Sequence, residues 1–165
     1  MRKPSRKVEL DDIISNQILG DDPEVIALVM MIHLALEAIL IELISAFRPD
    51  DKIYKLSFPA KTDLLQKQGL ISSHDQSAFD RLNDFRNDFA HIFGHRVTLS
   101  DALTLARDLE RDGVDFSDSV GHYTPEQATE YYGGMLGVLE EVGWCILFHA
   151  AYCLSETGGR DIFGP

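Results

Sequence analysis

The side chains best suited to chemistry are gathered in one short segment, RLNDFRNDFAH at residues 81–91. Apolar residues recur here with helical spacing, at Ala78, Leu82, Phe85 and Phe89, so the polar side chains fall on the outer side of an amphipathic helix. An imidazole exchanges protons near neutral pH, and a guanidinium binds oxyanions through paired hydrogen bonds. His91 and Arg86 are therefore candidates for proton transfer and anion binding, with Asn87 beside them.

Helical geometry limits how these three residues can act together. At about 100° per residue, Asn87 and His91 are neighbours on one face, whereas Arg86 and His91 diverge by about 140°. The Arg86 and His91 side chains can converge only if the helix unwinds near Gly94, or if a second copy of the helix approaches across a two-fold axis. Joint chemistry by these residues therefore implies a homodimer.

The elements that must position these residues are all predicted to be helices. A long apolar helix begins after the capping candidates Asp21 and Asp22 and continues to Arg48, and a shorter helix over 60–68 ends at Gly69. The remaining helices are predicted from Ser73 to about Gly94, from Ser100-Asp101 to Gly113, and from Thr124 to about Cys153. No strand-like alternation of useful length occurs, so we expect an all-α, up-and-down bundle of about five helices.

Two local patterns refine this prediction. Ser73 with Gln76, and Thr124 with Gln127, match the capping-box pattern at two helix starts. Gly133, Gly134, Gly137 and Gly143 fall inside the last predicted helix. Each glycine costs up to about 1 kcal/mol relative to alanine, so we expect them to permit close helix packing or a kink.

Charge and length bound the organisation of the chain. The 165 residues carry 15 Lys+Arg against 27 Asp+Glu, a net charge of −12, and four of the positive charges lie in the first seven residues. We expect a basic N-terminal arm at 1–20, one helical domain at 21–155 and a tail at 156–165. An acidic body repels phosphate, so any contact with nucleic acid must be local.

A cytoplasmic location is expected, with no membrane span. No apolar signal core follows the basic start, and His33, Glu37 and Glu42 interrupt the apolar stretch Val25–Phe47. Cys145 and Cys153 are eight residues apart in one predicted helix, or about 12 Å, which is beyond disulfide reach, so both are expected to be reduced core thiols.

Part of the chain resembles a known superfamily. An Arg-x4-His motif with a polar residue after the arginine resembles the HEPN (nucleotide-binding) superfamily of helical domains, and residues from about Leu34 to His91 look like its branch related to the mannitol operon repressor, labelled MltR-like. The residues that carry the resemblance are Leu56-Ser57-Phe58-x-x-Lys61-x-x-Leu64, Gly69-Leu70-Ile71-Ser72 and Arg86-Asn87-x-Phe89-Ala90-His91.

The resemblance implies two functions of different classes. The first is a HEPN-like, MltR-related regulatory or interaction protein, dimeric and acting through protein contacts. The second is a metal-independent endoribonuclease acting on RNA at a dimer cleft, in which His91 would be the acid or base, Arg86 would hold the phosphate, and Asn87 would fix the imidazole or position the phosphate. A third interpretation is structural: Arg86, Asn87 and His91 cap the helix end, with Arg86 bonded to a carboxylate such as Asp84 or Asp88.

No cofactor or metal site is predicted. The chain has no glycine-rich phosphate loop, G-x-S-x-G or H-E-x-x-H motif. His91 and His95 have metal-ligand spacing, but Gly94 between them should break the helix. His33 and His149 lie in apolar helices and are expected to be core histidines with satisfied hydrogen bonds.

Overall fold

The computed structural model describes residues 22–49, 51–91 and 97–164, and for residues 22, 51 and 89–91 it describes the backbone alone. The described residues form six α-helices and no strand, which confirms the all-α prediction. The basic arm at 1–20, Gly94 and His95 lie outside the described residues. The α-helices are α2 (Asp22–Phe47), α3 (Phe58–Lys67), α4 (Ser73–His91), α5 (Leu99–Arg111), α6 (Pro125–Tyr132) and α7 (Met135–Glu156), with short 3₁₀ turns η2 (Asp51–Lys55) and η3 (Val120–His122).

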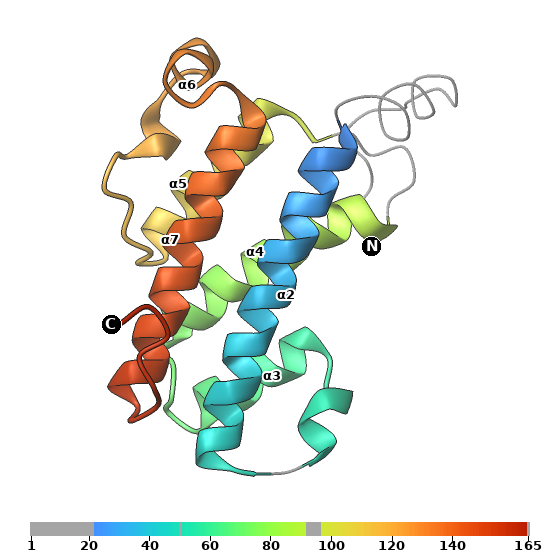
Figure 1. Cartoon of the computed structure of the whole chain (residues 1–165), viewed down its shortest axis with the longest axis vertical. Helices are drawn as coiled ribbons and strands as arrows, with labels where there is room; N and C mark the ends of the chain where they lie inside the picture. Colours follow the sequence, from blue (N-terminus) through green and yellow to red (C-terminus); the bar gives the residue numbers. More distant parts are fainter. Residues whose placement is uncertain (1–21, 50, 92–96, 165) are drawn as a thin grey trace.

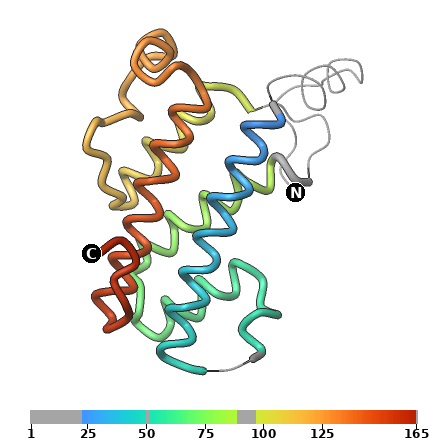
Figure 2. The backbone as a smooth tube through the Cα atoms, in the orientation of Figure 1, coloured from blue at the N-terminus to red at the C-terminus, as the bar shows by residue number. Residues whose placement is uncertain are grey.

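The two long apolar helices, α2 and α7, lie side by side and run in the same direction (Figure 1). They approach closely at Gly143, where an added Cβ would lie 2.5 Å from Cδ1 of Ile32. The glycine thus permits the close packing that the sequence predicted. The backbone tube shows α4 and α5 behind this pair (Figure 2), and the buried side chains of all four helices belong to one hydrophobic core.

Polar contacts fix α4 against its neighbours α3 and α5. The Thr62 hydroxyl on α3 donates to Asp80 of α4 at 2.8 Å. On the other side, Arg81 and Ser77 of α4 both donate to the Asp112 carboxylate that follows α5. These contacts hold α4, which carries Arg86 and Asn87, against the elements on both sides.

The helix starts agree with the predictions to within two or three residues. The Thr124–Gln127 capping box is confirmed. The box predicted at Ser73 and Gln76 is wrong by one residue: Ser72 and Asp75 exchange the two hydrogen bonds, because an aspartate can accept from the capping backbone N–H as a glutamine does.

The last predicted helix is in fact two helices. Gly133 and Gly134 adopt φ of +75° and +107°, values that L side chains rarely adopt, and they separate α6 from α7. The predicted kink is therefore a complete break. Its consequence is that α6 packs across the beginning of α7 at one end of the molecule (Figure 1).

The tail after α7 folds back along the bundle (Figure 1). Arg160 makes a two-point ion pair with Glu42 of α2, with distances of 2.5 and 3.0 Å. The Phe163 ring lies 4.5 Å from that of Phe148 and 6.2 Å from that of Trp144, measured between ring centroids. The described part of the tail is thus joined to both long helices.

Two helices, Pro23–Phe47 and Met135–Glu156, are long and apolar enough to cross a membrane when judged by length and composition alone. Of their most apolar windows, 39% and 44% respectively is buried inside the fold. Buried core helices of soluble proteins meet the same criterion, so the absence of a membrane span and the cytoplasmic location stay predictions.

Candidate functional site

Arg86 and Asn87 lie half-buried on the second half of α4. Nη1 of Arg86 donates to Oδ1 of Asn87 at 2.9 Å, so the arginine and its neighbour form one polar unit. His91 is the last residue of α4, and its side chain lies outside the described residues. The convergence of Arg86 with His91, and the dimer that it requires, therefore stay predictions.

A buried histidine on α2 extends this polar unit into the bundle. Nε2 of His33 lies 3.0 Å from Oδ1 of Asn83, which is one turn before Arg86 and Asn87 on α4. His33 and Asn83 are each only 5% exposed, and the His33 ring also lies 4.7 Å from the ring of Phe58. His33 is a core histidine, as predicted, but its second ring nitrogen, Nδ1, is buried without a hydrogen-bond partner.

The charge state of His33 follows from its surroundings. Burial lowers the pKa of the imidazole below its ordinary value, the Arg86 charge lowers it further, and the opposing effect of the Asn83 hydrogen bond is too small to cancel them. The ring is therefore neutral near pH 7, with Nε2 donating to the Asn83 oxygen and Nδ1 left as an acceptor.

The cluster consequently offers one unused acceptor and one unused donor. The acceptor is Nδ1 of His33, and the donor is Nε of Arg86, which is also buried without a hydrogen-bond partner. Within the described residues these are the only two buried side-chain polar atoms in that condition. Each of these atoms could form a hydrogen bond with a small polar group such as water or a hydroxyl.

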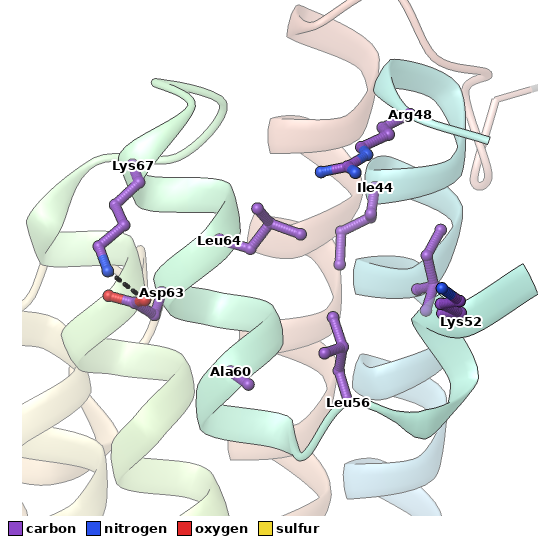
Figure 3. A pocket seen from close by; sticks show the side chains of 9 residues that line it. Ile44, Arg48, Lys52, Leu56, Ala60, Asp63, Leu64 and Lys67 are labelled. Atoms are coloured by element: carbon purple, nitrogen blue, oxygen red, sulfur yellow. Dashed lines mark hydrogen bonds and ion pairs between the residues drawn. The ribbon is translucent and has the colours of Figure 1, made fainter. Parts of the chain in front are cut away.

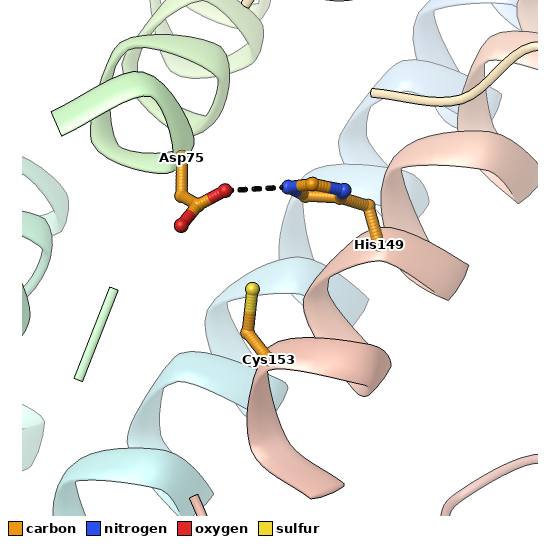
Figure 4. Close-up of side chains that lie close together, drawn as sticks. All are labelled: Asp75, His149 and Cys153. Carbon is orange, nitrogen blue, oxygen red and sulfur yellow. Dashed lines mark hydrogen bonds and ion pairs between the residues drawn. The ribbon is translucent and has the colours of Figure 1, made fainter. Parts of the chain in front are cut away.

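A second cluster joins the start of α4 to the end of α7. Nε2 of His149 lies 2.7 Å from Oδ1 of Asp75, and the Cys153 thiol faces them from one turn further along α7 (Figure 4). Burial alone would raise the pKa of Asp75, but hydrogen bonds from Ser72 and His149 outweigh it and hold that pKa below its ordinary value. His149 was predicted to be a core histidine, and this is only partly correct. Its ring is partly exposed and is bonded to a carboxylate.

The two cysteines are free thiols, as predicted. Burial raises the pKa of both Cys145 and Cys153 to about 12, so each free thiol is protonated near pH 7.

Among the pockets lined by described residues, two flank the bundle. The larger, of about 720 Å³, is lined by α7 and the loop after α5, with the following residues at its wall: Gly113, Asp115, Ser117, Glu141, Trp144, Cys145, Phe148, His149 and Tyr152. The smaller, of about 380 Å³, lies between α2, η2 and α3, where Ile44, Leu56 and Leu64 point inward (Figure 3). Lys67, one of the cations in its wall, is paired with Asp63 at 2.7 Å, so its charge is largely neutralised there.

No family model, curated protein or solved structure matches the chain. The resemblance to HEPN and MltR-like proteins therefore stays a prediction, and the functional argument depends on the geometry of the chain itself.

Sequence reasoning missed two members of these clusters. Asn83 is separated from His33 by fifty residues, and Asp75 from His149 by seventy-four, so no local pattern links them. A usable signal did exist in α2, where His33 and Glu37 are four residues apart and share one face of an otherwise apolar helix. Two polar residues on one face of a core helix indicate polar partners across the packing interface.

Proposed function

We propose that the chain is a HEPN-like, MltR-related helical interaction protein that works as a homodimer and acts through protein contacts. The observation that supports this proposal is an exposed, uncharged stripe along α2. Met31 and Leu34 on this stripe are 68% and 59% exposed, although the helix is one of the most apolar segments of the chain. Large, solvent-exposed apolar side chains on a core helix favour contact with another protein surface.

The stripe has the spacing of a helix-packing seam. Its members alternate at intervals of four and three residues, and none is charged: Ala27, Met31, Leu34, Ala38, Ile41 and Ser45. Ser45 donates its hydroxyl to the carbonyl of Ile41 within the helix, so its hydroxyl donor is already used. Alternating four and three spacing is what two packed helices require for knobs-into-holes contact.

We take a second copy of the chain as the occupant, and charge restricts the face on which it can dock. The chain carries a net charge of −12, so most faces of two copies repel each other. The α2 stripe avoids that repulsion and, over its 19 residues, extends for about 27 Å along the helix. A two-fold axis would place the stripe against itself, with the small residues Ala27 and Ala38 leaving space for Met31 and Leu34 of the other copy.

Light scattering coupled to size exclusion tests the proposal. We expect a dimer for the wild type and a monomer for Leu34→Glu, because the substitution places a carboxylate within the seam. Tyr54→Glu is the matched control, since Tyr54 is 72% exposed on η2, away from the stripe. A monomeric wild type, or a dimer that persists in Leu34→Glu, contradicts the proposal. A monomer that instead sediments with lipid vesicles would assign the stripe to a membrane surface.

The second candidate function is the metal-independent endoribonuclease. It is favoured by the unused donor of Arg86 and the unused acceptor of His33, because phosphate and hydroxyl oxygens could satisfy such groups. Cleavage of mixed RNA in the presence of a chelator, lost in both Arg86→Ala and His91→Ala, would support it. His122→Ala, at an exposed position on η3, is the control. Equal inactivity of the wild type and all variants rejects this candidate.

A further inference from the structure

Three side chains with different ligand atoms converge between α4 and α7. The carboxylate of Asp75, the imidazole of His149 and the thiol of Cys153 place one oxygen, one nitrogen and one sulfur within 4.8 Å of one another (Figure 4). His149 and Cys153 are four residues apart, so they project from the same face of α7, and Asp75 meets them from the first turn of α4.

We propose that Asp75, His149 and Cys153 form a binding site for a divalent transition-metal ion, with zinc as the best fit. Zinc accepts carboxylate, imidazole and thiolate ligands together, and hard cations such as Mg²⁺ or Ca²⁺ do not favour the thiolate and imidazole. Bond lengths of about 2.0–2.3 Å in a tetrahedral arrangement place ligand atoms about 3.4–3.7 Å apart. The present 2.7 Å contact between His149 and Asp75 would open by less than about 1 Å.

The ligands are already held in place by neighbouring groups. The backbone N–H of Ser72 donates to Oδ2 of Asp75 at 2.7 Å, which orients the carboxylate and leaves Oδ1 directed at His149. The Phe79 ring packs edge-on against the imidazole of His149, with ring centroids 6.0 Å apart. Such outer contacts fix the orientation of metal ligands, so little rearrangement is needed on binding.

The larger pocket gives a metal ion access to the site. His149 lies in its wall, the carboxylates of Asp115 and Glu141 line it, and no lysine or arginine does. A cation entering the pocket therefore meets an attractive field. Three protein ligands leave the fourth tetrahedral position for water or for a small ligand in the pocket, as in zinc sites that are open to solvent.

Binding of each metal ion releases one proton. The Cys153 thiol gives its proton to solvent when the sulfur–metal bond forms. In the tautomer that donates Nε2–H to Asp75, this proton leaves Nε2 and Nδ1 takes up a proton when Nε2 binds the metal, so the imidazole releases no net proton. Asp75 is already ionised and exchanges its hydrogen bond with His149 for a bond to the metal.

Cys145 provides a matched control on the same helix. It is a half-buried free thiol like Cys153, but it lies eight residues earlier, about 12 Å along the helix, and donates to Glu141 at 3.5 Å. A metal bound by Cys153 cannot also reach Cys145, so replacing each cysteine separately distinguishes the proposed site from non-specific thiol binding.

Cobalt titration tests the proposal with a signal that does not depend on activity. Metal-free, tag-free full-length chain is titrated with Co²⁺ under reducing conditions. We expect a near-ultraviolet thiolate-to-cobalt band that saturates at one ion per chain and disappears when Zn²⁺ is added. The band should be lost in Cys153→Ser and retained in Cys145→Ser. His149→Gln should weaken Co²⁺ binding at least tenfold, since it removes one of three ligands.

Absence of the band in the wild type, or its persistence in Cys153→Ser, overturns the proposal. So does loss of the band in a folded Cys145→Ser variant, because binding then depends on a thiol outside the site. If circular dichroism shows that Cys153→Ser does not fold, His149→Gln decides: Co²⁺ binding at wild-type affinity by that folded variant also overturns the proposal.

Discussion

The ammonium group of Lys61 lies 2.8 Å from a carboxylate oxygen of Glu37, and the Lys61 side chain is almost wholly buried between α2 and α3. A second hydrogen bond runs from Nζ to the carbonyl of Leu56 at 2.5 Å. A buried ammonium is costly to dehydrate, so its stability depends on these two acceptors. The contact fixes α3 against α2.

Removing the Glu37 carboxylate should destabilise the fold much more than removing the Lys61 ammonium group. We expect Glu37→Ala to lower the free energy of unfolding by about 3 kcal/mol, since it leaves a buried charge without its counterion. Lys61→Met fills the same space with an apolar chain and should cost clearly less, because the exposed edge of Glu37 can be hydrated. Urea unfolding measures both values. Equal losses in the two variants would contradict this account of the pair.

Because Gly143 packs closely against Ile32, substitutions at these two residues should have coupled effects on the free energy of unfolding. Gly143→Ala adds a Cβ within 2.5 Å of the Ile32 side chain, in a buried interface with little space to move. Overpacking of this kind costs about 1–3 kcal/mol, more than the helix preference of alanine returns. Ile32→Val removes the nearest methyl group, so the double variant should be more stable than the two single losses predict. Strictly additive unfolding free energies would show that the two residues do not clash.

The sequence predicts the helices of this fold well, since their signals are local. Pro23 after two aspartates starts α2, and Gly69 with φ of +70° follows the end of α3, both as expected. The break at Gly133 and Gly134 was not predicted as such, because two adjacent glycines are compatible with either a kink or a complete break. In the fold, Gly133 and Gly134 adopt φ of +75° and +107°, and α6 packs against α7.

The candidate sites were predicted less well, since they depend on contacts between distant segments. Arg86 and Asn87 were correctly placed on an amphipathic helix. The sequence did not indicate that Nη1 of Arg86 donates to Asn87, because an arginine on α4 has several polar neighbours. The pairing of His149 with Asp75 requires the tertiary arrangement that brings the start of α4 to the end of α7. Helical periodicity predicts the face of the helix on which each residue lies, but it does not predict which other helix that face contacts.

Trp144 should report docking of the tail. It is the only tryptophan in the chain, 56% exposed, and its indole lies near the rings of Phe148 and Phe163. Phe163→Ala removes the tail side of this contact, so the tryptophan emission should shift to longer wavelength as water reaches the ring. The free energy of unfolding should fall by no more than about 1.5 kcal/mol, the value of an aromatic pair at a partly exposed site. Unchanged emission would mean that the tail does not dock there in solution.

Acidification should destabilise the fold through His33. Because burial lowers the pKa of His33 in the folded chain, the unfolded chain binds more protons below its ordinary pKa of 6.5. The contribution of His33 to stability is therefore fully present above that value and is lost as the pH falls toward the lowered folded pKa. The carboxylates of Asp75 and Asp112 act in the same direction, but at lower pH, since their pKa values are lowered from 3.8.

His33→Gln isolates this contribution. The glutamine amide can still donate to Asn83 but does not titrate, so the loss of stability between about pH 7 and about pH 5 should be smaller in the variant than in the wild type. Urea unfolding across this range gives both curves, and their difference removes the effect of every other titrating group. His74→Gln is the same substitution at an exposed position and serves as the control. Parallel curves for the wild type and His33→Gln would show that the imidazole is not held neutral by burial in the α2–α4 interface.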